Sequence, residues 1–296
     1  MKGLGESARG HLAMLLFSVL VAGSFSLGAM AANLIAPAAL NALRFLIAGA
    51  VIGLVAWQSG KLERKAFSAP WRYLLLGGVF AAYFVLMFEG LKTAPPVSAA
   101  AVFTLTPVMS AGFGWLLLRQ ITTPRIALAL VVGATGALWV IFRADLAALL
   151  AFRIGTGEAI YFLGCVAHAL YTPLVRRLNR GEPAVVFSFG MMVAGFLMLA
   201  VWGWNDIRAT DWAALPPIVW LTIAYVSLAA SAMTFVLLQY ATLRLPAAKV
   251  MAYTYLVPSW VILWEIALGH GLPRGLVLVG VGLTAMALWL LLEEET

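Results

Sequence analysis

The sequence predicts an all-α integral membrane protein of ten transmembrane helices, arranged as two inverted five-helix repeats around a central cavity. Three observations support this fold class. The chain of 296 residues is 64% hydrophobic and only 10% charged, whereas soluble domains are roughly 25% charged. Its apolar residues form long runs with almost no charge. The two halves of the chain also resemble each other.

Ten apolar runs are each long enough to supply the ~20 residues that cross a bilayer. They lie at 11–31, 37–57, 70–90, 95–118, 124–142, 155–175, 184–203, 216–240, 246–268 and 273–292. Because the runs are continuously apolar, they favour helices over the alternating strands of a barrel. The first run is too long for a signal peptide and no cleavage site follows it, so we expect a retained helix. The single cysteine, Cys165, lies inside a run, where we expect a buried thiol and no intramolecular disulfide.

The positive charges indicate the orientation. If the amino terminus is cytoplasmic, thirteen of the nineteen Lys and Arg residues fall in inner segments, five fall in outer segments, and Arg44 falls within a run. The positive-inside rule therefore predicts a multi-pass protein with both termini in the cytoplasm. The formal charge of +7 is explained by this bias, so the bilayer is the expected partner and nucleic acid is not.

An internal repeat relates the two halves. When Pro107 is aligned with Pro258, Pro95 falls on Pro246 at the same offset. We expect a first repeat at 1–149 and a second at 150–296, each of five helices. A unit with an odd number of spans leaves its second copy inverted, and inverted repeats are characteristic of secondary transporters.

The paired prolines interrupt corresponding helices of the two repeats. Pro107 lies in the middle of the fourth predicted helix and Pro258 in the middle of the ninth. A proline inside a helix removes a hydrogen bond and kinks it. Two interpretations stay open: a kink that shapes the cavity, or a hinge that moves.

Three stretches carry a resemblance to a known family. ALNALRFLIAGAV (39–51) resembles the second-helix signature of the drug/metabolite transporter superfamily with EamA-type repeats. TLTPVMSAGFGWLLL (104–118) and YLVPSWVILWEIAL (255–268) resemble its fourth and ninth helices. Within the superfamily the chain is most similar to the YddG-type exporters of aromatic and other neutral amino acids. The resemblance implies export of such amino acids from the bacterial cytoplasm across the inner membrane.

One departure bears on energy coupling. Many relatives place a Gly-Glu pair at the inner end of the fourth helix and at the outer end of the ninth. Here those places read Arg119-Gln120 and Gly269-His270. Protons as a coupling partner are therefore left open, with uniport as the alternative. ATP is not expected as the energy source, because Gly60-Lys61 lacks the remainder of a P-loop.

Ionisable residues inside a membrane are functional hypotheses by default. We expect Arg44 to be structural, either snorkelling to the headgroups or pairing with a helix end. Glu89 and Lys92 are spaced for an i,i+3 pair, and Glu158 suits a helix amino terminus. The role of Glu265 stays open.

His168 is too deep in the sixth helix to snorkel, and Tyr161 and Tyr171 fall on the same face at helical spacing. This stripe lines a cavity or bonds a neighbouring helix. With polar and aromatic residues of the third, eighth and ninth helices it gives the predicted substrate cavity. That cavity comprises Tyr83, Met87, Tyr161, His168, Tyr171, Tyr225, Ser231, Tyr253 and Trp260.

A cavity of aromatics and hydroxyls suits a neutral or zwitterionic solute with an apolar side chain. Aromatic rings also hold cationic drugs or quaternary ammonium compounds, which is the main alternative. An intramembrane enzyme is a remote one, because it needs clustered Asp or His, and Asp occurs only at 145, 206 and 211. The sequence indicates no catalytic residues, no metal site and no cofactor.

Overall fold

The computed structural model describes residues 5–151, 154–271 and 275–292, and within these it is helical, without strands. Nine helical segments of the described residues are long and apolar enough to cross a membrane. They are α1 (Glu6–Ala31), α2 (Pro37–Gln58), α3 (Trp71–Leu91), α4 with α5 (Pro96–Phe103 and Thr106–Leu118), α6 (Pro124–Ile141), α8 (Thr156–Leu178), α9 (Ala184–Trp202), α11 with α12 (Pro217–Ser227 and Thr234–Thr242), and α13 with α14 (Ala247–Ala252 and Val257–Ala267).

The tenth predicted span corresponds to α15 (Gly275–Leu292). Its apolar stretch within the described residues, Gly275–Leu290, is shorter than the other nine spans. The predicted run 273–292 begins outside the described residues, so the full length of this span lies beyond what the structure describes. Three further short helices lie in the connections: η1 (Arg64–Phe67), α7 (Leu146–Leu150) and α10 (Trp204–Ala209).

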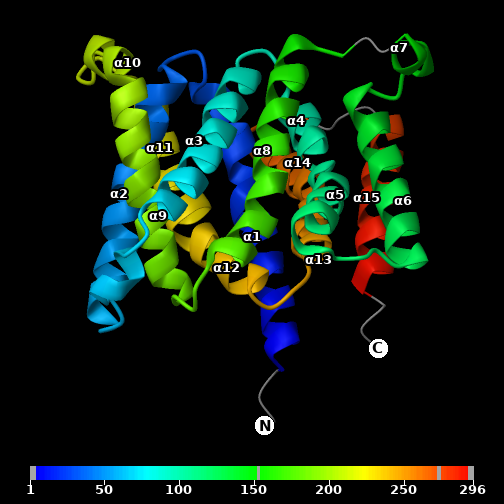
Figure 1. The fold of residues 1–296 in the computed structure, drawn as a ribbon. Coiled ribbons are helices and arrows are strands. Elements are labelled where there is room, and N and C mark those ends of the chain that lie inside the picture. The colour runs from blue at the N-terminus through cyan, green and yellow to red at the C-terminus, as the bar shows by residue number, and fades with distance from the viewer. Residues whose placement is uncertain (1–4, 152–153, 272–274, 293–296) are drawn as a thin grey trace.

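The helices form one bundle, and α1 begins at the same end at which α15 ends (Figure 1). We call this the termini end. The short helices α7 and α10 lie at the opposite end of the bundle. Large apolar side chains on the outside of the bundle, such as Leu54, Leu116 and Val131, are exposed. An exposed apolar belt is unfavourable in water and suits contact with lipid tails.

Two of the spans are broken where the sequence repeats its proline. After Phe103 the chain leaves α4 and α5 starts at Thr106, with Pro107 in its first turn. In the other half a 3₁₀ turn, η3 (Tyr253–Leu256), separates α13 from α14, and Pro258 lies in the first turn of α14. Proline is tolerated there because the first turn of a helix lacks an internal acceptor for its backbone N–H. Each proline thus begins a second helix.

The two breaks face each other in the middle of the bundle. Thr106 Oγ1 and Thr254 Oγ1 are 3.2 Å apart. On one side of this contact α4 packs against α14, and on the other α5 packs against α13. The fourth and ninth segments therefore cross at their interruptions.

A third irregularity lies in the eighth span. Between α11 and α12 the helix continues as a π-helical turn, η2 (Leu228–Met233). Such turns bond i to i+5, are rare, and occur frequently at functional sites. Its sequence, LAASAM, contains no proline or glycine that would predict such a turn.

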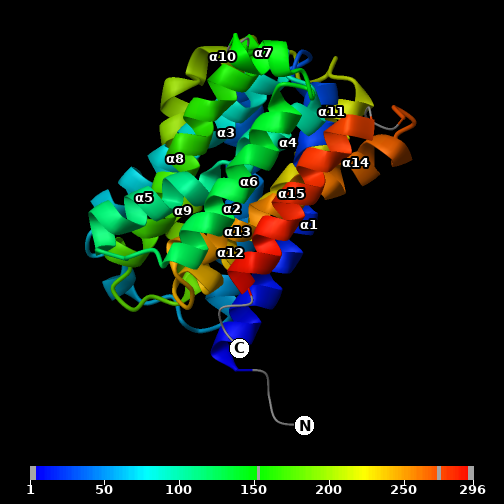
Figure 2. The ribbon, with the colours of Figure 1, turned by 90° about the vertical axis from the view of Figure 1, so that its right-hand side faces the viewer.

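Small residues allow close packing at the edge of the bundle formed by α6 and α15, which lie side by side (Figures 1 and 2). A Cβ on Gly136 would come within 2.6 Å of the Gly280 carbonyl oxygen, and one on Gly280 within 2.7 Å of the Gly136 oxygen. Close backbone approach through glycine is a usual way in which membrane helices associate, since lipid offers no hydrophobic driving force between them.

Candidate functional site

A small cavity lies between α1, α2, α3, α8 and the η2–α12 segment. Its free volume is about 10 Å³, which is room for about one water molecule. The lining is mostly aromatic or aliphatic, and no Asp or Glu belongs to it. It consists of Phe17, Val21, Ser24, Arg44, Phe80, Tyr83, Phe84, Met87, His168, Ala230, Thr234, Phe235 and Leu238.

The cavity contains a buried charge, because the Arg44 side chain is 0% exposed. Its Nε donates to Ser231 Oγ at 2.6 Å, and its Nη2 donates to the Ala230 carbonyl at 2.8 Å. Both partners belong to the π-helical turn η2. The guanidinium carbon also lies 3.5 Å from the centre of the Phe84 ring.

These contacts correct one of the two expectations for Arg44. Snorkelling to the headgroups is wrong, since the side chain turns into the bundle and is wholly buried. The alternative, pairing with backbone acceptors of a helix, is close to what is found, although the acceptor lies in a π-helical turn within a span and not at a helix end.

Three buried polar atoms on cavity-lining residues have no hydrogen-bond partner. They are Arg44 Nη1, His168 Nδ1 and Ser24 Oγ. Buried polar atoms are nearly always paired, so each exception needs an explanation. At this cavity a polar ligand or a water molecule would supply the missing hydrogen-bond partners.

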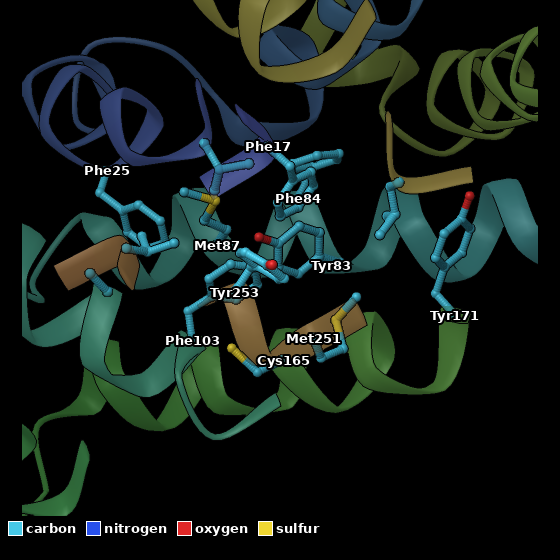
Figure 3. Close-up of a cluster of buried hydrophobic side chains, with 14 of the residues drawn as sticks. Phe17, Phe25, Tyr83, Phe84, Met87, Phe103, Cys165, Tyr171, Met251 and Tyr253 are labelled. Atoms are coloured by element: carbon cyan, nitrogen blue, oxygen red, sulfur yellow. The ribbon is translucent and has the colours of Figure 1, made fainter. Parts of the chain in front are cut away.

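His168 lies among aromatic rings, as its position in the predicted stripe suggests. Its ring centroid is 4.5 Å from that of Tyr83 and 5.0 Å from that of Phe103. The hydroxyls of Tyr83 and Tyr161 are 3.2 Å apart. The close-up in Figure 3 shows Tyr83, Phe84, Met87 and Phe17 gathered in one cluster, with Tyr171 apart from them.

The structure brings about half of the predicted cavity residues together. Tyr83, Met87 and His168 line the cavity directly. Tyr161 is one contact further out through its hydroxyl contact with Tyr83. Ser231 reaches the cavity by accepting the hydrogen bond of Arg44.

The other four predicted residues lie outside the cavity lining and join pairs of helices. The Tyr171 hydroxyl accepts a hydrogen bond from Gln239 Nε2 at 2.7 Å, and that of Tyr225 donates to the Leu20 carbonyl at 3.0 Å. The Tyr253 hydroxyl lies 3.0 Å from His11 Nδ1, and Trp260 Nε1 donates to Ser18 Oγ at 3.2 Å. For these residues the structure favours interhelical bonding over cavity lining.

Sequence reasoning missed most of the aromatic wall. Phe80 lies three residues before Tyr83, and Phe84 lies three residues before Met87. These spacings put all four on one face of α3, so its 3.6-residue period predicts them. Phe17, Val21 and Ser24 of α1 recur at i, i+4 and i+7, which is also the spacing of any core-facing stripe. Nothing in the sequence distinguishes the cavity face of α1 from an ordinary packing face.

The acidic residues of the spans are paired near the helix ends. The expected pair of Glu89 and Lys92 is confirmed at 2.7 Å. Glu158 lies in the first turn of α8, as expected, and accepts a hydrogen bond from Ser98 at 2.8 Å. Glu265, whose role the sequence leaves open, pairs with His270 at 2.9 Å beyond the carboxyl end of α14. Within the described ranges, His, Cys, Asp and Glu form no group of three suited to a metal.

A bundle of apolar helices is the architecture of a multi-pass membrane protein. Two broken spans in corresponding positions, crossing in the middle of the bundle, are typical of secondary transporters. The chain belongs to the EamA-like transporter family, whose model matches residues 8–142 and again residues 155–293.

One distant relative supports this assignment, and one solved structure shares the fold. An uncharacterized transporter of Bacillus subtilis, YyaM, is 26% identical over 266 residues, which cover 88% of this chain and 86% of that protein. A protein known from a crystal structure is 21% identical, covers 96% of each chain, and superposes with a TM-score of 0.73. At that identity the second likeness shows the fold alone.

Proposed function

We propose that the protein is a secondary transporter that exports neutral and aromatic amino acids from the bacterial cytoplasm by alternating access. The observation that carries this proposal is the central cavity, where aromatic walls surround a few convergent polar groups. Such a lining suits a small solute with an apolar body and a polar head. The free volume of the cavity is too small for an amino acid, so the state described here is closed and has to open for binding.

Alternating access follows from the proposed arrangement of ten transmembrane helices in two inverted repeats, 1–149 and 150–296. The packing supports it. A two-fold axis that relates the two repeats makes α9 the counterpart of α2 and α15 the counterpart of α6. The members of each of these pairs are in contact. The same axis turns the contact of α3 with α8 into that of the α11–α12 span with α1, and both occur. The two separate matches of the family model agree with this division.

The broken spans are the proposed place of movement. The breaks before Pro107 and Pro258 lie at the crossing of the two repeats and contact each other through Thr106 and Thr254. Discontinuous helices in corresponding positions are the usual surroundings of a transporter's site. Rocking of one repeat against the other would change the packing at this crossing first.

The proposed orientation places the termini end in the cytoplasm of a bacterial cell, with the bundle in its inner membrane. The connections α2–α3, α5–α6 and α8–α9 lie at this end (Figure 1). Their basic residues support the orientation, namely Lys61, Arg64, Lys65, Arg119 and Arg180. Short loops rich in Lys and Arg stay on the cytoplasmic side.

Uptake by proteoliposomes tests the substrate class. Purified protein is reconstituted and offered radiolabelled phenylalanine, threonine, methionine and a quaternary ammonium compound, with empty liposomes as the control. We expect the amino acids to accumulate inside to the outside concentration. Accumulation of the quaternary ammonium compound alone would replace the proposed substrate with a cationic drug.

An imposed pH gradient tests coupling to protons. A uniporter brings a zwitterionic amino acid to the same steady state with and without the gradient, because no charge or proton moves with it. A proton antiporter concentrates the amino acid on the acidic side. His168, which lines the cavity and has an unpaired Nδ1, is the residue to replace if the gradient has an effect.

A further inference from the structure

We infer that Arg44 binds the carboxylate of the transported solute, and that its charge excludes cationic solutes from the cavity. The inference rests on the proposed function, because it assigns the part of the substrate that this cavity recognises. It concerns a residue that the sequence predicts to be merely structural.

The charge of Arg44 has no counter-charge among the residues that the structure describes. Arginine remains protonated in proteins, and the side chain is wholly buried. The cavity lining contains no carboxylate, and none of the ion pairs found in the described residues involves Arg44. A buried charge is strongly unfavourable unless it is paired. An anionic group entering the cavity supplies the missing partner.

The contacts of Arg44 hold the guanidinium for such a partner. One edge is fixed by Ser231 and the Ala230 carbonyl, and one face is covered by Phe84. These two bonds use two of its five N–H groups, and Nη1 is left unpaired. A planar guanidinium binds a carboxylate through two parallel N–H groups, so a preset edge gives both affinity and orientation.

A purely structural role does not account for the same observations. A structural link between α2 and η2 explains the hydrogen bonds of Nε and Nη2. A neutral side chain such as Gln could make equivalent bonds without burying a charge. Such a link does not explain the unpaired Nη1, nor the unpaired Ser24 Oγ and His168 Nδ1 around the same cavity. A carboxylate offers acceptors, and an amino acid adds an ammonium donor, so one ligand can satisfy several of these atoms.

The same charge bears on the alternative substrate class. Aromatic rings attract cations, but the Phe84 face is already occupied by Arg44. Like charges in a poorly hydrated cavity repel each other strongly. A quaternary ammonium compound therefore meets a repulsive site in spite of the aromatic walls.

Analogues of phenylalanine test the inference on the unaltered protein. Binding is read as the rise in Tm of the purified protein, which requires no transport, and uptake is measured in parallel. L-Phenylalanine and 3-phenylpropionate carry the carboxylate, whereas phenethylamine carries only the ammonium group. We expect the first two to raise Tm and phenethylamine to leave it unchanged.

Two substitutions distinguish the effect of the positive charge from the effect of the planar guanidinium with its two parallel N–H groups. Arg44→Met removes both, and we expect the Kd of 3-phenylpropionate to rise about 10- to 100-fold, the range typical of a lost charge-assisted hydrogen bond. Arg44→Lys keeps the charge, and we expect a smaller loss and continued exclusion of phenethylamine. Gln239→Met is the matched control, because Gln239 is buried and hydrogen-bonded outside the cavity. It should leave the Kd unchanged.

The outcomes distinguish this inference from the proposed function. If 3-phenylpropionate binds in an Arg44-dependent way but amino acids are not transported, the inference stands and the proposed function fails. If phenylalanine is transported with the same KM by Arg44→Met, the inference fails and the function stands. Should phenethylamine alone raise Tm, the inference is overturned whatever is transported. If no analogue binds and none is transported, both are rejected.

Discussion

Ser231 is the residue that fixes the direction of the buried guanidinium. It accepts the hydrogen bond from Arg44 Nε at 2.6 Å and lies in the π-helical turn. Four residues earlier, Ser227 is equally buried, but its hydroxyl has no partner. The two serines therefore form a natural pair of test and control.

We expect Ser231→Ala to lower stability and weaken substrate binding together. Loss of the acceptor leaves a buried charged N–H group unsatisfied, at a cost of about 1–3 kcal/mol. The expected result is a lower Tm and a several-fold higher KM. Ser227→Ala removes no hydrogen bond and should change neither. Equal effects of the two substitutions would contradict the role given to Ser231.

Single residues of the site could be predicted from the sequence to the extent that they share a helix face. The helical spacing of His168 with two tyrosines predicts it, whereas Tyr83 and Met87 are predicted from residue type within an apolar span, and all three line the cavity. Arg44 was found as an intramembrane charge, but its partners lie 186 and 187 positions away in the chain. Helical periodicity carries no information across that distance, so snorkelling and burial could not be distinguished.

Among the helices, α6 and α15 are one pair whose close approach leaves no room for a larger side chain. Their backbones approach at Gly136 and Gly280, where each added Cβ would lie under 3 Å from the opposite carbonyl oxygen. Gly282, two residues further along α15, has nothing within 4 Å. The two positions share a helix and differ in what they face.

Gly280→Val should separate α6 from α15, whereas Gly282→Val should not. Overpacking a tight contact costs typically about 1–3 kcal/mol, and here the obstacle is backbone, which cannot rotate away. We expect a clear drop in Tm for Gly280→Val and a change near zero for Gly282→Val, measured by thermal unfolding of the purified proteins. A similar Tm for both would show that the two helices are free to move apart.

The helices and their breaks could be predicted from the sequence where the residues that cause them lie within the helix itself. The long apolar runs predicted the membrane spans, and the repeated prolines marked where two of them break. The π-helical turn at Leu228–Met233 could not be foreseen, because its residues include neither proline nor glycine. Its recognisable consequence, the hydrogen bond to Arg44, depends on tertiary packing.

In the whole molecule, an ion pair ties the two halves together at the termini end. Arg72 at the start of α3 bonds Glu182, in the connection between α8 and α9, at 2.7 Å. Arg72 also donates to the carbonyls of Leu178 and Ala66. Burial tends to raise the pKa of Glu182, but the hydrogen bonds from Arg72 and from the Arg180 backbone outweigh it and hold the pKa below its usual value.

This pair predicts a loss of stability in acid. A carboxylate whose pKa is depressed in the folded state stabilises that state above its unfolded pKa, which is about 4.3 for Glu. That contribution disappears as the pH falls below about 4.3 towards the lower folded pKa. We expect Glu182→Gln to lower Tm at neutral pH and to lessen the fall of Tm on acidification. Glu63→Gln, at an exposed position, should follow the unaltered protein at every pH.

Whether the whole molecule moves at the crossing of its two broken spans can be tested directly. If the breaks act as a hinge, the contact of Thr106 with Thr254, now 3.2 Å between hydroxyl oxygens, has to open and close in each cycle. If they are static kinks, it stays closed. Replacing both threonines by cysteine, with Cys165→Ala to remove the native thiol, allows the contact to be locked with an oxidant and released with a reductant.

For a hinge we expect oxidation to reduce amino acid uptake to less than about a tenth, and reduction to restore it, because rocking of one repeat against the other is blocked. The single variants Thr106→Cys and Thr254→Cys control for effects of the substitutions and of the oxidant. Full uptake by completely cross-linked protein would show that the breaks are rigid. The movement would then have to occur at other contacts between the two halves of the chain, such as α2 with α9 or α6 with α15.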